Sequence, residues 1–92
     1  MKVEISKDAL KSLKKAPTHI VLKISAWVEM VEQGGIDEAR RIPGYHDELL
    51  RGELKGKRSI RLSRQWRAIY SIKSKIVEFV LVEKVTPHEY KK

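Results

Sequence analysis

Two arginines in the second half of the chain, Arg61 and Arg67, have a spacing that could hold a phosphate group. Each stands in a segment in which polar and apolar residues alternate, 58–62 and 66–72, and such alternation is typical of strands. If a hairpin between these segments is centred on Arg64, the two arginines lie directly opposite each other on one face. Like charges so placed destabilise a sheet, whereas a phosphate between them would suit both guanidinium forks. The alternative, that the side chains splay into water or meet glutamates, stays open because the register is assumed.

A histidine and a tyrosine near the C-terminus, His88 and Tyr90, could complete such a site. A second hairpin centred on Ser74 would place Arg67 opposite Leu81 and lead the chain out just beyond the first turn. The histidine and the tyrosine would then lie at the same end of the sheet as the two arginines, so the sequence allows a convergent cluster of all four. Because both residues stand close to the C-terminus, a disordered tail is the alternative.

Two further titratable residues, His46 and Glu48, precede the first of these strands and could reach the opposite rim of the cluster. Each could instead be a solvated turn residue. The three histidines of the chain are widely separated, there is no cysteine, and neither a Gly-rich phosphate loop nor a Gly-x-Ser-x-Gly motif occurs. No metal-ligand spacing, thiol nucleophile or disulfide is therefore expected.

The first half of the chain has the pattern of two helices. Ser6 can cap a first helix, in which Leu10 and Leu13 share one face. Pro17 can open a second helix, and the Gly34-Gly35 pair can end it. The apolar stripe of this second helix consists of Ile20, Ile24, Trp27, Val28 and Val31. A helical hairpin with one buried face is the expected result.

The remaining segments predict a small sheet. A short strand around Val3 and Ile5 precedes the helices, and a meander of three strands over 58–62, 66–72 and 76–85 follows them and stops before Pro87. We therefore expect an α+β fold, a small antiparallel sheet with a helical hairpin packed on one face. A chain of 92 residues has room for one modest core, so residues 1–92 are expected to form a single domain.

The charge balance favours a polyanionic partner. Lys and Arg number 20 against 12 acidic residues, which gives a formal net charge of +8. Nucleic acid is the usual partner of so basic a chain, although charge alone leaves simple solubility equally open. No apolar run approaches the roughly 20 residues that span a bilayer, and the N-terminal residues lack the apolar stretch of a secretory signal. We expect a cytoplasmic protein with no membrane partner.

Two segments resemble a known family of proteins. Residues 54–72, LKGKRSIRLSRQWRAIYSI, resemble the core signature of RelE/ParE superfamily toxins: a leucine and a glycine before a strand with one arginine, a short turn, and a second strand that opens with arginine and carries tyrosine. Residues 82–90, VEKVTPHEY, look like the His/Tyr C-terminus of the RNA-cleaving members. The order of the expected strands and helices agrees with that family over nearly the whole chain. No single residue is diagnostic of the family; the ordered combination of these residues is.

The resemblance implies a RelE-like fold with an RNA-binding concavity, ribosome-dependent cleavage of mRNA, and neutralisation by a cognate antitoxin, with no metal or other cofactor. In the YoeB-like branch Glu48 matches the general base, Arg61 and Arg67 the phosphate-binding arginines, His88 the general acid and Tyr90 the terminal tyrosine. The chain departs from that branch at Glu89, which separates a histidine and a tyrosine that are otherwise adjacent, and at His46, which could replace Glu48 as the base. The candidate RNA-binding cations are Lys55, Lys57, Arg58 and Arg64.

Two other functions stay open on the sequence. A ParE-like toxin inhibits DNA gyrase and needs no catalytic residues, so the combination of Glu48, His88 and Tyr90 with the two arginines argues against it. The chain could also be a basic module that binds nucleic acid or protein, in which the histidine and the tyrosine are incidental. Substitution of His88 or Arg67 separates these functions from an RNase.

Overall fold

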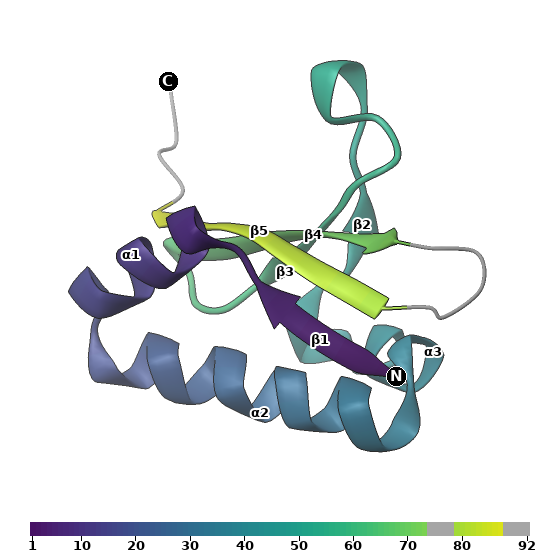
Figure 1. The fold of residues 1–92 in the computed structure, drawn as a ribbon, viewed down its shortest axis with the longest axis horizontal. Helices are drawn as coiled ribbons and strands as arrows, with labels where there is room; N and C mark the ends of the chain where they lie inside the picture. The colour runs from purple at the N-terminus through teal and green to yellow at the C-terminus, as the bar shows by residue number, and fades with distance from the viewer. Residues whose placement is uncertain (74–78, 88–92) are drawn as a thin grey trace.

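The computed structural model describes residues 1–73 and 79–87 of the chain. Figure 1 shows one layer of helices and one sheet. The helices are α1 (Lys7–Lys15), α2 (Thr18–Gly34) and α3 (Ile36–Arg40), with short 3-10 turns η1 (Pro43–Tyr45) and η2 (Gly52–Leu54). The strands are β1 (Lys2–Ile5), β2 (Glu48–Leu49), β3 (Arg58–Arg61), β4 (Trp66–Lys73) and β5 (Phe79–Pro87). Within the described residues they form one five-stranded sheet in the order β1-β5-β4-β3-β2.

The α+β class is confirmed, but the sheet is mixed rather than wholly antiparallel. Strands β2 to β5 pair antiparallel with their neighbours, whereas β1 pairs in parallel with β5, with Val3 opposite Val80. A parallel pair needs a long crossover between its strands, and the helices together with the meander provide it here. The prediction of an antiparallel sheet was wrong at this edge because the partner of β1 lies at the far end of the chain.

The helices begin and end where the sequence predicts. The Ser6 hydroxyl accepts a hydrogen bond from the Ala9 amide at 3.0 Å, and α2 ends at Gly35, whose φ of 86° favours glycine. One expectation is corrected: Leu10 is 47% exposed, and Ala9 is the buried residue of α1. The residue that shares the inward face with Ala9 is Leu13, four positions later, which packs against the core.

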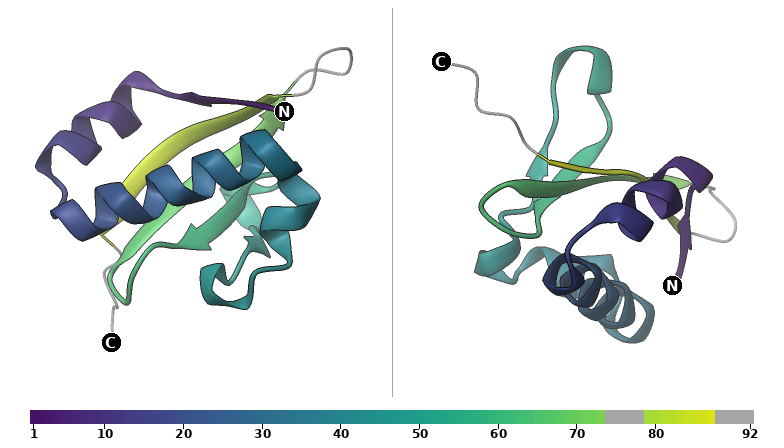
Figure 2. Two further views of the ribbon diagram at one scale, coloured as in Figure 1. Left: turned by 90° about the horizontal axis from the view of Figure 1, so that it is seen from below. Right: turned by 90° about the vertical axis from the view of Figure 1, so that its left-hand side faces the viewer.

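The core lies between the helices and one face of the sheet. Trp27 of α2 and Tyr70 of β4 are both fully buried, and their ring centroids lie 5.0 Å apart. Trp66 is partly buried against this core. Figure 1 and the right panel of Figure 2 show the helices below the sheet and the loop that contains η2 rising on the other side. Within residues 1–73 and 79–87, no α-helix covers the second face of the sheet.

Of the two predicted hairpin registers, one is confirmed and one is wrong. Arg61 pairs directly with Arg67, as a hairpin centred on Arg64 requires. Arg67 lies opposite Thr86 of β5, not opposite Leu81. Strands β4 and β5 meet at Lys73 and Phe79, so five residues connect them instead of three, and an irregularity between Ile69 and Tyr70 shifts the register once more.

Candidate functional site

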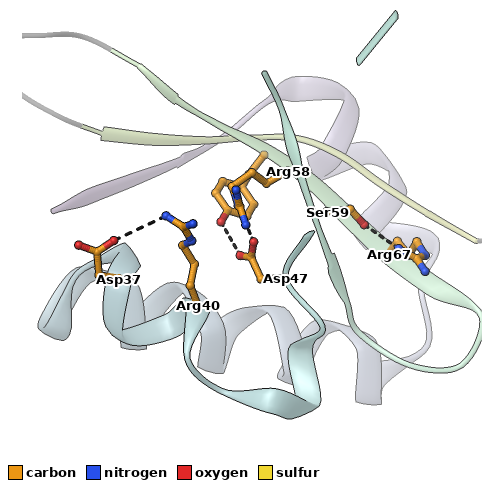
Figure 3. Close-up of polar contacts among 7 residues, drawn as sticks. Asp37, Arg40, Asp47, Arg58, Ser59 and Arg67 are labelled. Atoms are coloured by element: carbon orange, nitrogen blue, oxygen red, sulfur yellow. Dashed lines mark hydrogen bonds and ion pairs between the residues drawn. The ribbon is translucent and has the colours of Figure 1, made fainter. Parts of the chain in front are cut away.

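Arg67 is the centre of a polar group on the face of the sheet that carries no helix. In β4 the neighbours Ala68 and Tyr70 are buried in the core, so Arg67 projects to the opposite face. Its Nη1 donates to Glu48 Oε1 of β2 at 3.0 Å and to Ser59 Oγ of β3 at 2.9 Å. Figure 3 shows the bond to Ser59. Three neighbouring strands thus fix the direction of one guanidinium group.

Arg61 lies directly opposite Arg67 on the same face, as the sequence predicted. Among residues 1–73 and 79–87 its side chain has no hydrogen bond or ion pair, whereas that of Arg67 meets Glu48. The alternative that the arginines meet glutamates therefore holds for one of the two. Only one of the two guanidinium groups meets a carboxylate, and this leaves positive charge that an anion such as a phosphate could neutralise.

A cavity of about 320 Å³ lies beside Arg67. The loop between β2 and β3 forms one wall, and the strands form the floor. Its polar end carries Glu48 and Arg67, and its apolar part is made by side chains of the loop and of β4. The residues that line it are Glu48, Leu50, Leu54, Ser59, Arg67, Ile69 and Thr86. A flexible strand of nucleic acid could place a sugar or a base there, next to the two arginines.

The two C-terminal candidates, His88 and Tyr90, lie outside the described residues. The observed register still bears on them, because Pro87 pairs with Trp66, the residue next to Arg67. His88 follows Pro87 directly in the sequence. The described part of β5 therefore ends beside Trp66, and not beyond the turn as the expected register would have it.

The segment before β3 separates the two candidate bases. Glu48 contacts Arg67 and lines the cavity. His46 is exposed, has a φ of 44°, and does not line that cavity. The residue between them, Asp47, points to the opposite side of the sheet, as alternation along an extended segment requires. Its position beside Arg67 makes Glu48 a better candidate for the base than His46.

Asp47 was not singled out from the sequence, yet it is the most enclosed carboxylate of the region. Its side chain is 1% exposed; Oδ1 accepts from Arg58 Nε at 2.6 Å and Oδ2 accepts from the Tyr70 hydroxyl at 2.5 Å. Burial raises the pKa of Tyr70, and its bond to Asp47 raises it further. Burial alone would lower the pKa of Arg58, but the Asp47 carboxylate outweighs it and raises it. The three groups form one buried polar network.

The four candidate RNA-binding cations lie in different surroundings. Lys55 and Arg64 are exposed. Lys57 forms an ion pair with Glu83, and Arg58 is held by Asp47 on the face that the helices cover. Nothing in the local sequence distinguished the paired cations from the exposed ones, because their carboxylate partners come from other segments.

Lys57 and Glu83 join the loop to the sheet. Lys57 Nζ lies 2.6 Å from Glu83 Oε1, and Ser71 Oγ donates to Glu83 Oε2 at 2.6 Å. Burial raises the pKa of Glu83, but the hydrogen bonds from Lys57 and Ser71 outweigh it, so that the pKa lies below its ordinary value of 4.5. This carboxylate holds the end of the loop whose side chains form one wall of the cavity.

The lowered pKa of Glu83 predicts a contribution to acid unfolding. A carboxyl group whose pKa is lower in the folded state stabilises the fold above its unfolded pKa, and that stability is lost as the pH falls through the folded pKa. The Glu83→Gln variant should therefore lose less stability than the wild type between about pH 6 and about pH 3 in urea unfolding. Glu53→Gln, at an exposed position of the same loop, is the control and should follow the wild type. Parallel acid profiles for the wild type and Glu83→Gln would contradict this assignment.

The part of the chain that the structure describes offers neither a metal-ligand group nor a membrane-spanning helix. Within residues 1–73 and 79–87, no three residues among His, Cys, Asp and Glu come together in a way that could hold a metal ion. No helix in this part of the chain is both long and apolar enough to cross a membrane.

Solved structures share this fold, although no family model matches the sequence and no curated protein matches it. The YoeB/ParE toxin from Agrobacterium tumefaciens has a TM-score of 0.72 at 18% identity, over 97% of this chain and 100% of that chain. YafQ from Escherichia coli has a TM-score of 0.74 at 19% identity, over 94% and 91%. The toxin–antitoxin complex RelBE2 from Mycobacterium tuberculosis gives 0.59 at 25% identity, over 96% of each. The RelE/YoeB-like toxin fold that the sequence predicted is confirmed.

Proposed function

We propose that this chain is a cytoplasmic endoribonuclease toxin of a toxin–antitoxin pair that cuts mRNA on the ribosome. The observation that carries the proposal is the position of Arg67, opposite Arg61 and in contact with Glu48, on the sheet face without helices. This arrangement combines two phosphate-binding groups with a carboxylate base. The fold agrees with it, since the chain shares the fold of proteins described as toxins.

The proposed reaction is a transesterification that needs one base and one acid. Glu48 takes the proton of a ribose 2′-hydroxyl, and the resulting oxygen attacks the adjacent phosphorus. The bond from phosphorus to the 5′-oxygen breaks, and His88 donates a proton to that leaving oxygen, with Tyr90 beside it. Arg61 and Arg67 stabilise the charge on the phosphorane. The products are a 2′,3′-cyclic phosphate and a 5′-hydroxyl.

Two macromolecular partners follow from the proposal. The first is an antitoxin: YafQ and YoeB, whose folds this chain shares, have been solved in complexes with the antitoxins DinJ and YefM. The second is the ribosome with its mRNA, to which a net charge of +8 would bind. Because such binding releases counterions, it should weaken steeply as the salt concentration rises.

The test is primer extension on an mRNA translated in a bacterial cell-free system that contains the purified protein. We expect cuts at fixed positions within codons, and we expect them to disappear when ribosomes are omitted. An unbroken mRNA despite growth arrest in cells would overturn the proposal. A DNA supercoiling assay would then test gyrase inhibition, the alternative to which the description of one structural neighbour as a YoeB/ParE toxin also points.

A further inference from the structure

A second group of arginines lies on the helix-covered side of the sheet, where α3 meets β3. Arg40 ends α3, Arg41 follows it, and Arg58 begins β3. Together with Asp37 they line a hollow of about 330 Å³. In Figure 3, Asp37, Arg40 and Arg58 lie on one side of β3 and Arg67 lies on the other. The hollow is therefore separate from the cavity beside Arg67.

The guanidinium group of Arg58 is held by two partners, Asp47 and Tyr70. Its Nε is bound to Asp47, whose second oxygen is occupied by the Tyr70 hydroxyl. The Tyr70 oxygen is a second partner of the guanidinium group, and its interaction with Arg58, together with that of Asp47, raises the pKa of Arg58, which burial alone would lower. The network thus orients Arg58 at the wall of the hollow. A guanidinium group has five N–H donors, so these two partners leave donors for a bound phosphate oxygen.

The other two arginines are paired only loosely. Arg40 lies 3.7 Å from Asp37, and Arg41 lies 3.7 Å from Glu38. Both are exposed pairs at the C-terminal end of α3, and pairs of this kind contribute little to stability. The carboxylates balance the formal charge of the hollow, but at these distances they form no hydrogen bonds. A phosphate that accepts two parallel bonds from a guanidinium fork can replace them.

We propose that this hollow binds a phosphodiester group of an RNA strand, as a second site beside the proposed catalytic one. The identification of the anion as RNA rests on the proposed function. Arg58 and Ser59 are neighbours on β3 that face opposite sides, and Ser59 bonds Arg67. The two arginine groups therefore lie on the two sides of β3, which pairs at these residues with the short edge strand β2. Phosphates repeat along a nucleic-acid strand, so a strand that passes around this edge can reach both groups.

The test is the affinity of the full chain for a fluorescent single-stranded RNA whose 2′-hydroxyls are methylated, so that binding is measured without cleavage. The Arg40→Gln/Arg41→Gln double variant should bind about tenfold more weakly at low salt. The slope of log affinity against log salt should fall by about 0.7, which corresponds to one lost phosphate contact on a single strand. The control is Lys14→Gln/Lys15→Gln, which removes the same charge from exposed positions of α1 and should change the affinity less than about threefold.

An equal loss in both double variants would overturn the proposal, since it would show a diffuse charge effect, and so would no loss in Arg40→Gln/Arg41→Gln. If that variant is also less stable, the proposal is tested by NMR on the wild-type protein. Titration of the same RNA must then shift the Nε–Hε resonance of Arg58. Cleavage of translated mRNA is measured separately. A wild type that binds through these arginines without cutting contradicts the proposed function alone, and one that cuts without needing them for binding contradicts this inference alone.

Discussion

Replacement of Arg67 by alanine is expected to lower ribosome-dependent mRNA cleavage by roughly 10²–10³-fold and to abolish growth arrest. The substitution removes the donor that would stabilise the charge on the phosphorane. It also frees Glu48, whose carboxylate is held by Arg67 Nη1 at 3.0 Å. Single-turnover cleavage of an mRNA on purified ribosomes is the measurement, because it separates chemistry from binding.

Lys11→Ala is the matched control, since it removes one positive charge from an exposed position of α1. It should cleave at nearly the wild-type rate. His88→Ala is the companion variant, and as the proposed general acid it should lose roughly 10²–10⁴-fold. If Arg67→Ala and His88→Ala both remain folded and toxic, the assignment of a nuclease site to this face is wrong.

Replacement of Asp47 by alanine is expected to destabilise the fold by about 3–5 kcal/mol. The side chain is 1% exposed and is the partner of both Arg58 and Tyr70. Its loss leaves a largely enclosed guanidinium group and a buried hydroxyl without their acceptor. Urea unfolding followed by circular dichroism measures the effect, and for a domain of this size that loss is a large part of the total stability.

The control for Asp47 is Asp37→Asn, because Asp37 also pairs with an arginine but at 3.7 Å and with an 81% exposed side chain. That variant should shift the free energy of unfolding by less than about 0.5 kcal/mol. A loss in Asp47→Ala no greater than in Asp37→Asn would show that the buried network contributes nothing to stability.

The features that the sequence determined are local ones. The cap at Ser6, the proline at the start of α2 and the glycines at its end fix the helix boundaries, because each acts through backbone groups within a few residues of itself. The register of the first hairpin is local as well. A short turn around Arg64 ties β3 to β4, and the alternation then sets Arg61 and Arg67 on the same face.

The features that only the tertiary structure decided all depend on pairing between distant segments. The parallel partner of β1, the opposition of Arg67 to Thr86 and the carboxylates that meet Arg67 and Arg58 are examples. The segment around Asp47 has no periodicity that marks its partners, and in a two-residue strand each side chain is directed by the strand beside it. Local periodicity says which face a side chain occupies. The packing of the whole chain determines which segment pairs with that side chain. Closing a long loop costs entropy, and the contacts that offset this cost form only with the complete core.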